Sequence, residues 1–133
     1  MMDKKVYKSY AILRLIMTDL IVCMSSGKGT WEHVSKVIDG QAWNKVFIIT
    51  GGFFKDKINR QEAELVVIDT TKTITGMAEE IKNSLKGKIN DLEVAVNFIS
   101  GEGREHMALV SALIQLGLGI RLMALTPEGV KEV

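Results

Sequence analysis

The chain has one cysteine, almost no net charge and no long apolar run, and each of these shortages excludes a class of protein. Seventeen basic residues against sixteen acidic ones give a formal net charge of +1, so we expect neither duplex DNA nor an anionic membrane to be bound through overall charge. Cys23 cannot form an intrachain disulfide, and its place in an apolar segment predicts a buried thiol in a reducing compartment. We therefore expect a cytoplasmic protein.

The N-terminus has some features of a secretion signal, because three lysines among the first eight residues precede an apolar stretch over 10–17. Arg14 interrupts this stretch, which is too short to cross a bilayer, and no small-residue cleavage site follows. We expect no signal and no membrane segment. Residues 1–18 are predicted to be an N-terminal extension or edge element, and residues 19–133 a single domain with its own core.

From residue 19 onward, short apolar runs alternate with amphipathic segments of helical period, which is typical of βα units around a parallel sheet. The predicted strands cover residues 20–24, 46–49, 65–68, 92–99 and 120–125. The predicted helices are one capped by Thr30 and ended by Gly40, a short one within 55–62, and two over 74–85 and 104–116.

This order predicts an α/β fold, a three-layer Rossmann-like doubly wound parallel sheet of about five strands in the order 3-2-1-4-5. In that order the first and fourth strands are neighbours at the switch point of the sheet. Ligands of such sheets bind there, beyond the carboxyl ends of the strands.

Both of these strands are followed by glycine-rich loops, which read Ser25-Ser26-Gly27-Lys28-Gly29-Thr30 and Ser100-Gly101-Glu102-Gly103-Arg104-Glu105-His106. Each loop precedes a helix N-terminus, where free backbone N–H groups and the helix dipole favour an anion. Glycine permits close backbone approach, the serine hydroxyls can donate to phosphate oxygens, and Lys28 and Arg104 add positive charge. We expect residues 25–30 and 100–104 to converge and bind a phosphate-rich nucleotide ligand.

Other interpretations stay open, because glycine and serine are common in any strand-to-helix turn and could serve chain reversal alone. Residues 27–30 also resemble the end of the phosphate loop of a P-loop nucleotide-binding enzyme, and Asp69 could be its metal-binding acid. Val22 stands where that motif requires its leading glycine. No Gly-x-Gly-x-x-Gly follows the first strand, so we expect no nicotinamide and no other cofactor.

The segment over 96–107, together with the helix and glycine-rich turn that follow it, resembles the CRISPR-associated Rossmann-fold (CARF) domain. In that family the fourth strand carries an Asn and ends in Thr or Ser, followed by Gly-Gly-Thr-Lys-like residues and an apolar helix. Here Asn97, Ser100, Gly101 and Arg104 match those places, whereas Glu102-Gly103 stand where the family often has Gly-Thr. The two serines after the first strand also resemble the family's first ligand loop.

The resemblance implies a homodimer that binds cyclic oligoadenylate across its two-fold axis, with Asn97 added to the ligand-binding residues. Two copies of a paired anion-binding loop suit a ring that carries several phosphates. A sensor or sink for the ring and a ring nuclease that degrades it are both consistent with this resemblance.

In the family's ring nucleases a ribose 2′-hydroxyl attacks the adjacent phosphate without a metal, so the protein supplies alignment and charge stabilisation. The candidates here are Lys28 and Arg104 for the negative charge and His106 for the proton, with Ser26 orienting the phosphate. Cys23, His33 and His106 are scattered along the chain, so we predict no metal site.

The last predicted helix is apolar over more than one face. Its apolar residues include Met107, Leu109, Val110, Leu113, Ile114 and Leu116. This breadth fits the core alone or a core plus a subunit contact. The alternative function is an interaction module, in which both loops only turn the chain and this helix recruits a partner protein.

Overall fold

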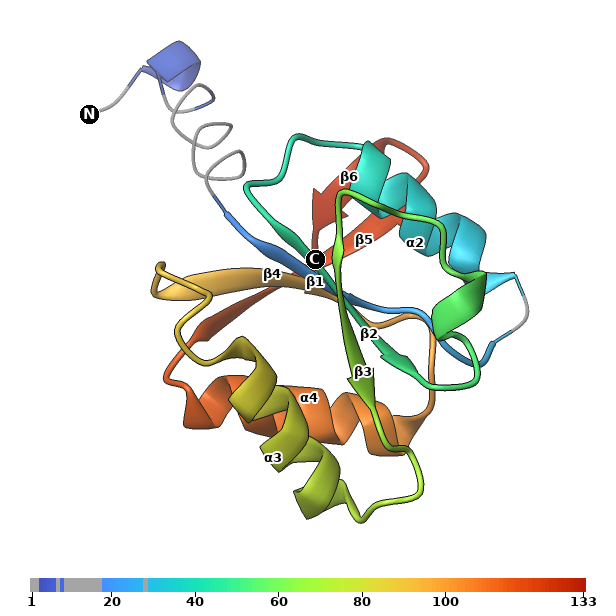
Figure 1. Cartoon of the computed structure of the whole chain (residues 1–133). Helices are drawn as coiled ribbons and strands as arrows, with labels where there is room; N and C mark the ends of the chain where they lie inside the picture. Colours follow the sequence, from blue (N-terminus) through green and yellow to red (C-terminus); the bar gives the residue numbers. More distant parts are fainter. Residues whose placement is uncertain (1–2, 7, 9–17, 28) are drawn as a thin grey trace.

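The computed structural model of the protein describes residues 3–6, 8, 18–27 and 29–133. The predicted extension over 1–18 therefore lies largely outside the described residues. The described chain forms one six-stranded sheet with helices on both faces (Figure 1). Its strands are β1 (Leu20–Cys23), β2 (Val46–Gly51), β3 (Glu64–Ile68), β4 (Glu93–Asn97), β5 (Gly119–Thr126) and β6 (Gly129–Glu132).

The strand order is β3-β2-β1-β4-β5-β6, and the first five strands are parallel. This confirms the predicted fold class and the order 3-2-1-4-5. The sixth strand was not predicted: β6 pairs antiparallel with β5 through a tight turn in which Thr126 faces Gly129. The Thr126 hydroxyl donates to the Gly129 carbonyl over 2.8 Å, and Gly129 has a φ of 106°, which favours glycine.

Two apolar layers lie on the two faces of the sheet. Helix α2 (Thr30–Asp39) covers one face, and helices α3 (Ile74–Leu85) and α4 (Gly103–Gln115) pack side by side on the other (Figure 1). Side chains alternate along β1, so that Leu20 and Val22 join the α2 side while Ile21 and Cys23 join the opposite side. All four residues of β1 are fully buried, as expected of a central parallel strand.

Two local predictions were wrong. Thr30 is not the N-cap of α2 but its first residue, since Gly29 with a φ of 84° takes the cap position and the Thr30 hydroxyl donates to the Gly27 carbonyl over 2.6 Å. The predicted helix over 55–62 is only a 3-10 turn, η1 (Lys55–Lys57). Beyond it, Arg60 forms a bidentate ion pair with Asp39 at the end of α2, and this tertiary contact holds the segment without a helix.

We predict that Leu109→Ala in α4, where Leu109 is fully buried between helix and sheet, lowers the free energy of unfolding by about 2–5 kcal/mol, because the substitution leaves a cavity in the core. Urea denaturation measures this change. The control is Leu92→Ala at the opposite, amino edge of β4, where the leucine is 83% exposed and a change within about 0.5 kcal/mol is expected. Equal losses in both variants would contradict the assignment of α4 to the core.

Candidate functional site

The loops after β1 and β4 are hydrogen-bonded to each other. The Ser25 amide donates to the Ser100 hydroxyl over 2.9 Å, and the Gly101 amide donates to the Ser26 carbonyl over 2.7 Å. The Ser100 hydroxyl also donates to the Ser26 carbonyl over 3.3 Å. The strand order predicted this convergence, and these bonds fix the spacing of the two loops at the carboxyl edge of the sheet.

A buried acid completes this junction. The Ser25 hydroxyl donates to Oε2 of Glu105 over 2.7 Å, and both side chains are buried. The hydroxyls of Ser25 and Ser100, which we predicted to meet a phosphate, are thus engaged within the protein. Beneath them, burial raises the pKa of the Cys23 thiol to about 12, and the Glu105 carboxylate adds to that rise.

Gly101 allows this close contact between the loops. Its φ of 102° lies in the left-handed region, and a Cβ at this position would lie 2.9 Å from the Ser25 hydroxyl, 3.0 Å from a Glu105 oxygen and 3.1 Å from Nε2 of His106. Any side chain would therefore push the two loops apart.

A cavity of about 210 Å³ lies beside the junction, between the loops that follow the first four strands. The β1 loop contributes its two serines, the β4 loop contributes Glu102, and the first turn of α4 contributes Arg104 and Glu105. The other lining residues are Gly51 at the end of β2, Phe53 and Phe54 in the loop that follows it, and Thr70 in the loop after β3. Loops of four strands thus meet at one hollow at the switch point of the sheet.

Arg104 lies in this cavity and also holds its wall together. Its guanidinium donates to the Thr70 carbonyl over 3.2 Å and to the Lys72 carbonyl over 2.5 Å, which ties the start of α4 to the loop after β3. A guanidinium has five N–H donors, so donors remain for an anionic ligand. Lys28, predicted as its partner, lies outside the described residues.

The helices next to the two loops begin without a side-chain cap. The N-cap residues are Gly29 for α2 and Glu102 for α4, and neither provides a side chain that accepts a hydrogen bond from a helix amide. In α3, by contrast, the Thr73 hydroxyl accepts from the Gly76 amide over 3.1 Å. At α2 the Thr30 amide is already used, because it donates to the Gly27 carbonyl over 3.1 Å. The first-turn amides of α4 have no side-chain cap, so this helix end keeps donor capacity and the partial positive charge that attracts anions. Gly27, Gly29 and Gly103 are exposed around these helix ends but do not line the cavity.

Asn97 belongs to a second cavity, of about 420 Å³, beside β4 and β5. Its amide nitrogen donates to the Met123 carbonyl over 2.8 Å and lies 3.2 Å from Nε2 of His33. The Leu125 backbone amide donates to Nε2 of His33 over 3.3 Å. Nε2 of His33 is therefore an acceptor, and Nδ1 carries the proton. From the sequence, His33 was considered only in excluding a metal site, because no pattern near this residue predicts its contact with β5.

His106 lines the second cavity but not the first. Its Nε2 is 2.8 Å from the Ser100 carbonyl, which can only accept, so Nε2 is the protonated nitrogen. The ring packs against Phe98 with a centroid distance of 5.0 Å. The Nδ1 atom is therefore the remaining candidate for proton transfer.

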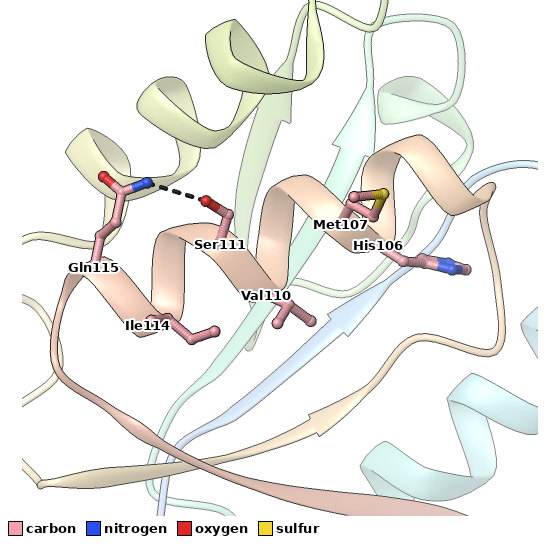
Figure 2. A pocket seen from close by; sticks show the side chains of 6 residues that line it. All are labelled: His106, Met107, Val110, Ser111, Ile114 and Gln115. Atoms are coloured by element: carbon pink, nitrogen blue, oxygen red, sulfur yellow. Dashed lines mark hydrogen bonds between the residues drawn. The ribbon is translucent and has the colours of Figure 1, made fainter.

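Helix α4 also presents an apolar groove of about 460 Å³ on its outer face (Figure 2). Figure 2 shows its lining side chains spread along the length of the helix, from its first turn to its last: His106, Met107, Val110, Ser111, Ile114 and Gln115. Met107 and Ile114 are 63% and 65% exposed, while Leu109 and Leu113 on the same helix are buried in the core. The helix is therefore apolar on its inner and its outer face.

The comparisons with known proteins give no family. No protein-family model matches the chain, and no curated protein matches it significantly. Among the described residues, no group of three or more His, Cys, Asp or Glu side chains is placed to hold a metal ion. In the same part of the chain, no helix combines the length and apolarity that crossing a membrane requires.

We predict that Ser25→Ala lowers the free energy of unfolding by about 1–3 kcal/mol, because it removes the hydroxyl that donates to the buried Glu105 carboxylate. Thermal and urea denaturation measure the change. The control is Ser111→Ala, which removes an exposed hydroxyl that accepts from Gln115 on the outer face of α4. Equal free energies of unfolding in the two variants would show that the hydrogen bond from Ser25 to Glu105 does not stabilise the fold.

Proposed function

We propose that the protein binds a phosphate-rich nucleotide ligand, a cyclic oligoadenylate, in the cavity between the β1 and β4 loops. The observation that carries the proposal is the direct hydrogen bonding of two glycine-rich loops beside a cavity that contains Arg104. The resemblance of the β4 segment to CARF domains supports the choice of a cyclic oligoadenylate.

The distribution of charge around the cavity limits where a phosphate would lie. Glu102 and Glu105 also line it, and a phosphate is repelled by their carboxylates. Glu105 is buried against Ser25, and Glu102 is exposed and free to turn toward solvent. A phosphate would therefore lie toward Arg104 and Ser26, near the uncapped amides at the start of α4.

A homodimer would double this site. We propose that the apolar groove on α4 is the subunit contact, because Met107 and Ile114 leave large apolar side chains in solvent there. His106 lines this groove and is hydrogen-bonded to the β4 loop, so a partner on this face would lie next to the ligand-binding loops. The same groove favours the second candidate, an interaction module that binds a different protein.

Ring cleavage is the extension of this proposal. A ribose 2′-oxygen would attack the adjacent phosphorus and lose its proton, while the bond between phosphorus and the 5′-oxygen breaks. The 5′-oxygen would take a proton from water, which leaves a 2′,3′-cyclic phosphate and a 5′-hydroxyl. Arg104, with Lys28, would stabilise the charge on the phosphate oxygens. His106 does not line this cavity, so its Nδ1 would take the proton by way of a water molecule. Binding requires only the cavity and its donors, and it is the function that the site supports best.

We predict that the protein binds cyclic tetra-adenylate or cyclic hexa-adenylate without metal. The double variant Lys28→Ala/Arg104→Ala should bind at least about tenfold more weakly, because it loses two cationic donors to phosphate. Isothermal titration calorimetry in EDTA measures the affinity, and chromatography of the same mixtures detects linear products. The matched control is Lys86→Ala/Lys131→Ala, which removes two exposed charges outside the cavity.

Binding that is lost in the first double variant and kept in the second would support the site, and linear products would add ring nuclease activity. Failure of the unaltered protein to bind either ring would remove the proposed ligand. Equal binding by all variants would remove Lys28 and Arg104 from the site.

We predict that the protein is a dimer in solution and that Ile114→Glu shifts it to a monomer, because a carboxylate cannot be buried unpaired in an apolar contact. Size-exclusion chromatography with light scattering gives the mass of each species. Leu92→Glu places the same charge at an exposed leucine on the opposite edge of the sheet and should remain dimeric. A monomeric unaltered protein would contradict the homodimer and leave the groove to a different partner.

A further inference from the structure

The loop after β2 places an aromatic side chain at the candidate site. Gly51 ends β2, and Phe53 and Phe54 follow it, both lining the cavity beside Ser26 and Arg104. Phe53 is 74% exposed, although a ring of this size is ordinarily buried in a chain that has only four phenylalanines. An exposed aromatic ring at the edge of a polar cavity requires an explanation.

The position of this ring is fixed by a series of aromatic contacts. Phe53 meets Phe54 edge to face, with centroids 5.0 Å apart and an interplanar angle of 88°. Phe54 meets Trp31 in the same manner at 6.0 Å and 61°, and the Trp31 indole N–H donates to the Ser25 carbonyl over 2.8 Å. The series therefore ends on the β1 loop, so the exposed ring is held relative to the loop junction.

One face of the Phe53 ring is already covered. The Lys57 ammonium lies 4.0 Å from its centroid, in a cation–π contact that also brings positive charge to the edge of the cavity. Because Phe53 is still 74% exposed, much of its ring surface remains for a planar ligand group. An exposed ring that is fixed in advance can stack a base with little loss of conformational freedom.

We propose that Phe53 is the stacking platform for a base of the bound nucleotide, with the adjoining phosphate held toward Arg104. The inference rests on the proposed function and adds the residue that recognises the base. Aromatic faces accept any base, because every base has a π-face, so Phe53 supplies affinity for a nucleotide over a bare phosphate. The nearby Lys57 and Arg104 suit the negative charge that a nucleotide carries next to its base.

The test uses Phe53→Leu, which keeps an apolar side chain but removes the aromatic face, and Phe53→Trp, which keeps a stacking face. Binding of cyclic tetra-adenylate and cyclic hexa-adenylate is measured by calorimetry for both variants, the unaltered protein and the Leu92→Ala control. Because a base stacked on an aromatic side chain contributes about 1–3 kcal/mol, Phe53→Leu should weaken binding roughly 5- to 150-fold. Phe53→Trp should bind as the unaltered protein does.

Tryptophan fluorescence separates stacking from a merely structural role. In Phe53→Trp the fluorescence of the new indole should be quenched when the cyclic oligoadenylate binds. This quenching should exceed any change in the fluorescence of Trp31 and Trp43 in the unaltered protein. Unchanged affinity in Phe53→Leu, or weaker binding in that variant without added quenching in Phe53→Trp, would overturn the stacking role while leaving the proposed function intact. No binding by the unaltered protein would overturn the proposed function and this inference with it.

Discussion

The hydrogen bonds that join the β1 loop to the β4 loop determine the geometry of the whole carboxyl edge of the sheet. Ser25 and Ser100 are uncharged, yet the hydrogen bond between them connects segments 75 residues apart. The Glu105 carboxylate accepts from the Ser25 hydroxyl and so holds the first turn of α4 at the same junction. Because these groups are buried, leaving any one of them without its partner costs free energy. The cavity, the start of α4 and the aromatic series through Trp31 all take their positions from this junction.

Much of the fold was predictable, because the alternation of apolar runs and amphipathic segments reflects burial that every βα unit must achieve. The central strand β1 is apolar at every position and is buried on both faces, which makes its signal strong. The hairpin strand β6 has only four residues and is at most half-buried, so its pattern does not differ from that of a terminal loop. The polar segment over 55–62 predicts a helix, but only the 3-10 turn at Lys55–Lys57 forms. The ion pair of Arg60 with Asp39 joins segments that are distant in the sequence, so no local pattern predicts it.

The sequence placed the two loops at the switch point, but it did not distinguish side chains that build the site from those that face a ligand. Ser25 and Ser100 were expected to donate to phosphate, and instead their hydroxyls close the loop junction. Asn97 was grouped with the loops, although it hydrogen-bonds to His33 and to the β5 backbone on the other side of β4. The sequence did not predict a role for Phe53 and Phe54 after β2. Phe53 reaches the cavity only because segments from four parts of the chain come together there, and no local sequence pattern indicates this.

The burial of Cys23 has a chemical consequence for the protein as a whole. Thiolates, not thiols, react with alkylating agents and disulfides, and a pKa of about 12 keeps this thiol protonated at neutral pH. It lies directly beneath the loop junction, in the fully buried β1 strand. The folded protein therefore has no reactive sulfhydryl, and modification of its single cysteine marks those molecules in which the central strand has come out of the sheet.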